Sequence, residues 1–189
     1  MTGRLVAVVG PSGVGKDTLM DAARAALEGD GRFVFIRRAI TRPAEAGGED
    51  HLPLSREAFE ARRDAGGFAL WWEAHGLLYG LPREAVEAAI AADRVAVANL
   101  SRHALAEAAA RYPLRVLSIT APVALRAARL AARGRESAED VAQRLAREAP
   151  LPPGLDIETV VNDGSVEEGA ARVLAALRRA AQPREAMRA

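Results

Sequence analysis

Cysteine is absent from the sequence and lysine is nearly so, since a single lysine accompanies 25 arginines. The lack of cysteine excludes disulfides, thiolate metal sites and thiol catalysis, and it is typical of a cytoplasmic protein. The apolar run near the N-terminus, Leu5–Val9, is far too short to span a membrane. We therefore expect a cytoplasmic protein that has no membrane partner.

A dominant charge is also lacking, because 26 basic and 25 acidic residues nearly cancel. This balance does not favour wrapping of a nucleic acid, so we expect no nucleic-acid partner. The one lysine is Lys16. A compact ammonium differs from a planar guanidinium in size and geometry, so a chain that uses arginine elsewhere indicates a specific role for this residue.

Short apolar runs alternate with alanine-rich amphipathic stretches, which is typical of parallel strands covered by crossover helices. We therefore expect an α/β fold with a doubly wound, five-stranded parallel sheet. The expected strands are Leu5–Val9, Phe33–Ile36, Val95–Ala98, Val116–Ile119 and Thr159–Val161. The expected helices are one over residues 19–27 that stops at Gly29, two opened by Pro82 and Pro122, and two capped by Ser137 with Asp140 and by Ser165 with Glu168.

Two segments interrupt this alternation. Residues 38–80 contain paired glycines, both tryptophans and the two sides of a hairpin, so we interpret them as an inserted substrate-binding subdomain. Residues 126–147 are dense in arginine. We expect one domain over residues 1–180, with a core of residues 1–37 and 81–180, followed by a tail over residues 181–189.

A glycine-rich motif follows the first expected strand and opens the first helix, as a Walker A loop requires. Its spacing is G-x-x-x-x-G-K, and its residues are Gly10, Pro11, Ser12, Gly13, Val14, Gly15, Lys16 and Asp17. Glycines let backbone N–H groups turn inward, and the helix N-terminus adds a positive dipole end. The motif therefore predicts binding of the phosphates of ATP, with the lysine at the β- and γ-phosphates.

The residue after the lysine departs from the usual motif. A Ser or Thr normally ligates Mg²⁺ there, whereas this chain has Asp17 followed by Thr18. A carboxylate is a stronger ligand, so we assign both residues to the metal. The alternative is that Asp17 is simply an acidic residue favoured by the helix dipole.

Several motifs together resemble the guanylate kinase superfamily over nearly the whole chain. They are Gly10–Asp17, Ile40-Thr41-Arg42-Pro43, Trp72-Glu73-Ala74-His75-Gly76, Tyr79-Gly80, Arg133-Gly134-Arg135-Glu136 and Asn162-Asp163-Gly164-Ser165. One branch is more similar still, namely the ribose 1,5-bisphosphate phosphokinases of bacterial phosphonate degradation, which make 5-phosphoribosyl 1-diphosphate. That branch carries G-K-D in the loop and N-x-S-R after the third strand, as in Asn99-Leu100-Ser101-Arg102.

Departures from guanylate kinase point to the same branch. Arg42 matches one of the two arginines that hold the nucleotide phosphate, whereas Glu45 and His51 replace the other arginine and a tyrosine. Leu70 stands where a glutamate reads the guanine edge, and a leucine accepts no hydrogen bond. Asn99 replaces one of the acidic residues that end the third strand, and Ser101 replaces the other.

The resemblance implies a P-loop kinase fold, with ATP as co-substrate, Mg²⁺ and a small phosphorylated sugar as acceptor. It implies an arginine-rich lid that carries Arg133, Arg135 and Arg144, and an Asn162 that borders the adenine. Lys16, Asp17, Arg133 and Arg135 are the expected catalytic residues. The expected substrate-binding residues are Arg42, His51, Glu73, His75, Tyr79, Asn99, Ser101, Arg102 and Arg144. We expect a monomer or a homodimer.

Some alternatives stay open at this stage. A nucleoside monophosphate kinase is the nearest rival, and a non-catalytic guanylate-kinase-like binding module is more distant because the loop keeps its lysine. Arg126 and Arg129 share a helix face with Arg133, and they form either a phosphate-binding surface or a solvated one. The first expected strand leads into the loop, and the third leads to Asn99. If these two strands are neighbours in the sheet, Asp17 supplies the negative charge that Asn99 and Ser101 no longer supply at the end of the third strand.

Overall fold

The computed structural model describes residues 3–44, 49–132 and 150–182. Its core is a sheet of five strands in the order β2-β7-β1-β8-β9, in which every neighbouring pair is parallel. The strands are β1 (Arg4–Val9), β2 (Phe33–Phe35), β7 (Val95–Asn99), β8 (Leu114–Thr120) and β9 (Ile157–Val161). The five-stranded parallel sheet expected from the sequence is confirmed.

Helices cover both faces of this sheet, which explains the continuous apolar character of its strands. β1 is buried along its whole length, and its side chains alternate between two apolar clusters. Leu5, Ala7 and Val9 pack on the side of α3 (Arg83–Ala91) and α4 (Leu105–Arg111). Val6 and Val8 pack on the side of α1 (Lys16–Ala26) and α7 (Val166–Ala180).

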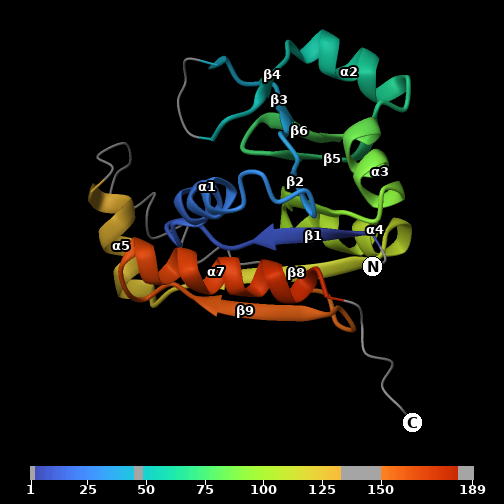
Figure 1. Cartoon of the computed structure of the whole chain (residues 1–189). Helices are drawn as coiled ribbons and strands as arrows, with labels where there is room; N and C mark the ends of the chain where they lie inside the picture. Colours follow the sequence, from blue (N-terminus) through green and yellow to red (C-terminus); the bar gives the residue numbers. More distant parts are fainter. Residues whose placement is uncertain (1–2, 45–48, 133–149, 183–189) are drawn as a thin grey trace.

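A second sheet of four strands lies on the β2 side of the core sheet, with α2 (Arg56–Asp64) at its far side (Figure 1). Its strands are β3 (Ala39–Ile40), β4 (Leu52–Pro53), β5 (Phe68–Ala74) and β6 (Leu77–Pro82), in the order β4-β3-β6-β5. β5 and β6 form the antiparallel hairpin expected in this segment. We call β3 to β6 with α2 the subdomain.

The helix signals in the sequence have mixed outcomes. Ser165 and Glu168 form the expected capping box of α7, while Ser137 and Asp140 lie outside the described residues. Pro82 is the N-cap of α3 rather than its first residue, and α5 (Val123–Ala132) follows Pro122 directly. The sequence pattern did not predict α2, α4 (Leu105–Arg111) or the 3₁₀ helix η2 (Arg102–Ala104). None of the described helices is long and apolar enough to cross a membrane.

Candidate active site

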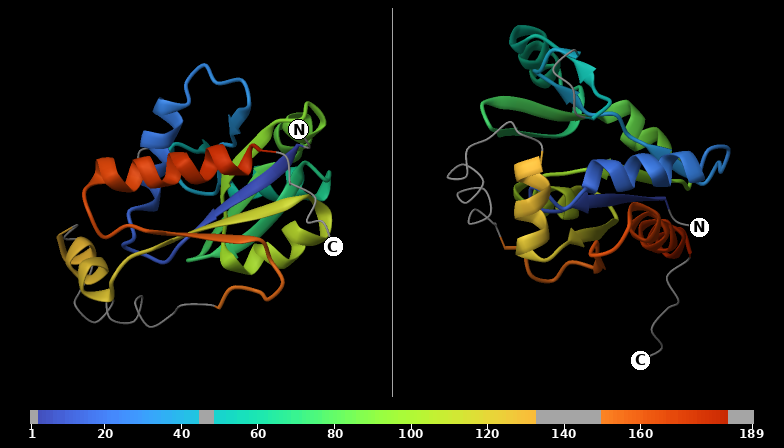
Figure 2. Two further views of the ribbon diagram at one scale, coloured as in Figure 1. Left: turned by 60° about the horizontal axis from the view of Figure 1, so that its bottom comes forward. Right: turned by 90° about the vertical axis from the view of Figure 1, so that its left-hand side faces the viewer.

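The phosphate-binding loop lies between β1 and α1, where the sequence predicts it. Gly13 and Gly15 have φ angles of 81° and 80°, in the left-handed region that glycine adopts without strain. A Cβ atom at Gly13 would lie 2.8 Å from the backbone oxygen of Arg126, so a side chain cannot be added there without a shift. The loop therefore needs glycine both for its turn and for close packing on α5, which Figure 2 (right) shows in gold beside the start of α1.

A cavity of about 260 Å³ opens in front of this loop and reaches the subdomain. The loop residues 10–17 line it together with Asn99, Leu100 and Ser101, which follow from β7. The subdomain contributes Arg38, Trp72, Ala74, His75 and Tyr79. Five of the expected substrate or metal residues therefore meet in one cavity: Asp17, His75, Tyr79, Asn99 and Ser101.

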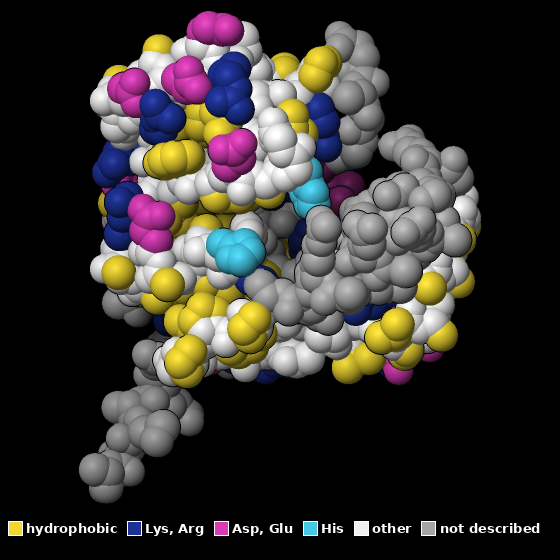
Figure 3. Space-filling view, turned by 180° about the vertical axis from the view of Figure 1, so that it is seen from behind, with side chains coloured by type: hydrophobic (Ala, Val, Ile, Leu, Met, Phe, Trp, Pro, Cys, Tyr) yellow, Lys and Arg dark blue, Asp and Glu magenta, His cyan; other side chains and the backbone are white. Residues whose placement is uncertain are grey.

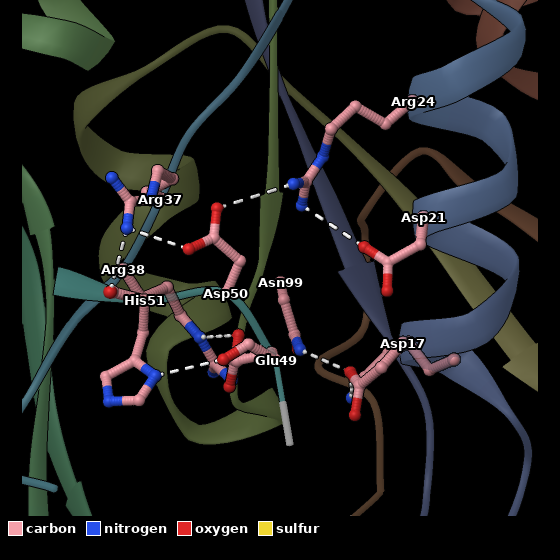
Figure 4. Close-up of polar contacts among 10 residues, drawn as sticks. Asp17, Asp21, Arg24, Arg37, Arg38, Glu49, Asp50, His51 and Asn99 are labelled. Carbon is pink, nitrogen blue, oxygen red and sulfur yellow. Dashed lines mark hydrogen bonds and ion pairs between the residues drawn. The ribbon is translucent and has the colours of Figure 1, made fainter. Parts of the chain in front are cut away.

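Asp17 and Asn99 contact each other across this cavity (Figure 4). The side-chain amide of Asn99 donates to Asp17 Oδ1 at 3.1 Å, and Lys16 Nζ lies 3.8 Å from the same oxygen. β1 and β7 are neighbours, with Val8 paired to Asn99 in register. The expectation that the loop and the end of β7 face one crevice is confirmed.

The metal prediction depends on Asp17. This side chain lines the cavity, whereas Thr18 is exposed and does not belong to the described lining. Among the described residues, no three acidic or histidine side chains form a group that would hold a metal ion without a substrate. Mg²⁺ in kinases is commonly held by one or two carboxylates, by water and by the substrate phosphates. A single carboxylate beside the phosphate loop fits that mode of binding.

The subdomain wall of the cavity is aromatic and cationic. The rings of Trp72 and Tyr79 are stacked, with centroids 5.7 Å apart and an interplanar angle of 3°. The Arg38 guanidinium lies 5.1 Å from the Tyr79 ring centroid. Burial raises the pKa of Tyr79 above its usual value. Its hydroxyl therefore stays protonated at neutral pH and is available as a hydrogen-bond donor to an anion.

His75 reaches the cavity from the tip of the β5–β6 hairpin. His75 and Gly76 both have positive φ angles, 53° and 73°. Two successive left-handed residues are typical of a tight hairpin turn whose twist matches that of the strands. The short turn brings His75 to the cavity that the phosphate loop also lines.

Other predicted substrate residues lie away from this cavity. Arg42 lines a neighbouring hollow with Thr41, Ser55 and Arg56. The His51 ring is buried, with Nδ1 2.9 Å from the Glu49 carbonyl oxygen and Nε2 3.0 Å from the Arg42 carbonyl oxygen.

Glu73 is exposed, 3.9 Å from Arg56, and Arg102 begins η2 directly after Ser101. Their contacts with a substrate stay predictions. The three arginines assigned to the lid, Arg133, Arg135 and Arg144, lie outside the described residues.

The rear of the phosphate loop is held by side chains from α5 and from the end of β9. Arg126 is 3% exposed, and its Nε donates to the Ser12 carbonyl oxygen at 3.1 Å. The Asn162 side-chain amide donates to the Val14 carbonyl oxygen at 2.7 Å, and Arg129 Nη1 lies 3.3 Å from the same oxygen.

These contacts decide one open alternative. Neither Arg126 nor Arg129 belongs to a purely solvated face, since both hold the backbone of the loop. Asn162 contacts the loop backbone directly, and its contact with adenine stays a prediction.

Arg38 is a charged residue of the cavity that was not predicted from the sequence. It is 9% exposed and forms an ion pair with Glu49. The available signal was a basic residue directly before a buried apolar pair, Ala39 and Ile40, in the segment expected to bind substrate. A charge at the start of a buried strand has to be paired or used, and that rule would have selected Arg38.

Acidic and basic side chains lie intermixed over the subdomain on the face shown in Figure 3. Specificity for an anionic substrate therefore depends on individual groups in the cavity rather than on a general surface charge.

Known proteins resemble this chain in fold and in sequence. A family model described as guanylate kinase matches residues 2–180. The guanylate kinase from Anaplasma phagocytophilum has a similar structure, with a TM-score of 0.70 over 97% of this chain and 88% of that one. Its sequence identity of 18% means that this likeness shows the fold alone.

Two curated relatives are much more similar in sequence. The ribose 1,5-bisphosphate phosphokinase PhnN of Rhizobium etli is 48% identical over 177 residues, which cover 93% of this chain and 89% of the relative. The bifunctional ribose 1,5-bisphosphokinase-thymidine phosphorylase of Azorhizobium caulinodans is 52% identical over 172 residues. That match covers 90% of this chain but spans 25% of the length of the bifunctional relative. The chain belongs to the guanylate kinase family and, within it, to the family of the ribose 1,5-bisphosphate phosphokinases.

Proposed function

We propose that the chain is an ATP-dependent kinase that phosphorylates ribose 1,5-bisphosphate to 5-phosphoribosyl 1-diphosphate in phosphonate catabolism. The cavity that joins the phosphate loop to the subdomain carries this proposal, because Lys16, Arg38 and Tyr79 all line it. The names of the relatives that are about half identical to this chain support the same acceptor.

The reaction forms one P–O bond and breaks another. An oxygen of the 1-phosphate attacks the γ-phosphorus of ATP, and the bond from that phosphorus to the β,γ-bridging oxygen breaks, so ADP leaves with the electron pair. The attacking oxygen is already anionic near neutral pH, so the site needs no general base. Catalysis then depends on holding two phosphate groups in line and on neutralising their charge.

The residues of the cavity match these two tasks. The inward N–H groups of the loop and the start of α1 bind phosphate oxygens, and Lys16 adds a compact positive charge beside them. The neutral hydroxyl of Tyr79 can donate a hydrogen bond to a phosphate of the sugar substrate. Asp17 is the residue that would hold Mg²⁺ with the nucleotide, and the ion would supply further charge neutralisation.

Guanine recognition finds little support on this chain. Leu70 is 1% exposed and packs in the apolar cluster that the subdomain shares with the core sheet, so it offers no acceptor for a purine edge. A buried purine N–H left without a partner costs about 1–3 kcal/mol. This cost disfavours the alternative of a guanylate kinase.

Phosphorus NMR of the reaction mixture tests the proposed reaction. Incubation with ATP, Mg²⁺ and ribose 1,5-bisphosphate is expected to give ADP and two new coupled signals from a diphosphate on C1. Release of ADP together with inorganic phosphate, with the sugar signals unchanged, would instead show hydrolysis of ATP and would contradict the proposal.

A further inference from the structure

The proposed acceptor carries a second phosphate that does not react. The 1-phosphate receives the γ-phosphoryl group, so the 5-phosphate is a remote anion that the site has to bind or leave in water. Binding energy from such a remote group is what an enzyme uses to position the reacting one. The subdomain wall of the cavity is the place to look for its partner, since the loop and Lys16 are committed to ATP.

We infer that Arg38 binds this remote phosphate and thereby selects a bisphosphate over acceptors with a single phosphate. The inference rests on the proposed function. Arg38 lines the same cavity as the phosphate loop, and it brings to the subdomain wall a guanidinium that stays charged at any physiological pH. Arginine is the side chain best suited to phosphate, because its planar fork donates two parallel hydrogen bonds.

The surroundings of Arg38 hold its guanidinium in one orientation. Its central carbon lies 5.7 Å from the Trp72 ring centroid and 5.1 Å from the Tyr79 ring centroid. Its Nε donates to Glu49 Oε2 at 2.9 Å, and its Nη2 donates to Glu49 Oε1 (Figure 4). A side chain fixed on two sides loses little entropy when a ligand binds, so the site is preorganised.

Glu49 does not use up the donors of Arg38. A guanidinium has five N–H groups, and the contacts with Glu49 engage Nε and Nη2. Within the described part of the chain, the Nη1 side of the fork is left for another acceptor. Glu49 is thus a positioning residue, because its two carboxylate oxygens fix the orientation of the Arg38 guanidinium.

The neighbouring arginines fit this role less well. Arg42 lines the separate hollow beside Ser55 and Arg56. Arg37 is half exposed and donates to Asp50 at 2.7 Å, and Asp50 in turn lies 3.6 Å from Arg24 on α1 (Figure 4). Arg37 is therefore an arginine next to Arg38 in the sequence that does not belong to the described lining of the cavity, and its replacement is a matched control.

The test compares the native enzyme with Arg38→Met and Arg37→Met. Three quantities are measured for each: kcat/KM for ribose 1,5-bisphosphate, KM for ATP, and the inhibition constant of ribose 1-phosphate, which lacks the remote phosphate. We expect Arg38→Met to lower kcat/KM for the bisphosphate by about 10- to 100-fold, the range for a charge-assisted hydrogen-bonded contact. The KM for ATP and the inhibition constant of ribose 1-phosphate are expected to stay unchanged, and Arg37→Met is expected to match the native enzyme.

Two further variants keep the inference testable if Arg38→Met does not fold. Arg38→Lys keeps the charge but loses the fork, so a smaller loss confined to the bisphosphate is expected. Glu49→Gln disturbs the orientation of Arg38 and should raise the KM for the bisphosphate while kcat is kept. An unchanged or lower KM in Glu49→Gln would overturn the positioning role.

The outcomes separate this inference from the proposed function. If the native enzyme does not phosphorylate the bisphosphate, the proposed function fails. If the native enzyme does so and the Arg38 variants lose affinity for ribose 1-phosphate as much as for the bisphosphate, Arg38 supports the cavity only in a structural way. That second result would overturn the assignment of Arg38 and leave the proposed function in place. The same holds if the Arg38 variants behave like Arg37→Met.

Discussion

The hydrogen bond between Asn99 and Asp17 links the start of α1, just after the phosphate loop, to the end of the neighbouring strand β7. An amide at this strand end can donate to the carboxylate, whereas a second carboxylate in its place would repel it. The pair explains how this chain tolerates an acidic residue directly after the loop lysine. It also supports the idea that the carboxylate for the metal has moved from the end of β7 to the start of α1.

A set of exchanges at these positions tests that idea. Asp17→Ser is expected to lower Mg²⁺-dependent kcat/KM by about 10²-fold or more, because a ligand and its charge are lost together. Adding Asn99→Asp or Ser101→Asp should recover part of this loss. Either aspartate in the native background should be harmful, since two carboxylates would then meet in the cavity.

The measurement is kcat/KM against Mg²⁺ concentration for the single and double variants, analysed as double-mutant cycles. Thermal unfolding without Mg²⁺ or nucleotide serves as the control for folding. Strictly additive effects with no recovery at saturating Mg²⁺ would show that the two strand ends do not share the ion.

At the scale of elements, the phosphate loop depends on α5 behind it as much as on its own glycines. Arg126 donates to the carbonyl oxygen of Ser12, and Gly13 packs so closely that a Cβ atom would meet the backbone of α5. Two carbonyl groups of the loop, those of Ser12 and Val14, are thus bonded by side chains at its rear. α5 leads directly toward the arginine-rich segment from residue 133.

Gly13→Ala tests the close contact, with Gly29→Ala as a matched control. Both glycines have left-handed φ angles, 81° and 82°, but a Cβ atom at Gly29 would meet nothing within 4 Å. The control should cost about 1–2 kcal/mol of unfolding free energy and leave the KM for ATP unchanged. Gly13→Ala should cost more and should also raise the KM for ATP. Equal effects of the two exchanges in both measurements would show that the contact with α5 is unimportant.

Arg126→Met tests the support of the loop from behind. We expect a loss of about 1.5–3 kcal/mol in unfolding free energy, since a buried charged hydrogen bond is removed, together with a raised KM for ATP. The exposed Arg178 on α7 provides the control Arg178→Met, which should change neither quantity. Chemical denaturation gives the unfolding free energy and steady-state kinetics give the KM for ATP of both variants. A normal KM for ATP in Arg126→Met would contradict a role in holding the loop.

At the scale of the whole molecule, the sequence predicts the core sheet better than it predicts the subdomain. Apolar runs such as Leu5–Val9 are buried on both faces and leave a clear signal, and the loop motif fixes the place of the first helix. β3 and β4 are two residues long each, and α2 buries the single side chain of Phe59, so their patterns are too short to detect. The pairing of Arg38 with Glu49 joins residues 11 positions apart, ahead of the neighbouring strands β3 and β4, and no local pattern encodes it.

The choice of acceptor is the central claim. The most direct measurement is kcat/KM, by coupled release of ADP, for ribose 1,5-bisphosphate, GMP and other nucleoside monophosphates under one set of conditions. Leu70 offers nothing to a purine edge, while Arg38 faces the cavity with a charge suited to a second phosphate. We expect the bisphosphate to exceed every nucleotide by at least about 10²-fold, as for sites whose polar groups match one substrate. A higher kcat/KM for GMP would contradict the account.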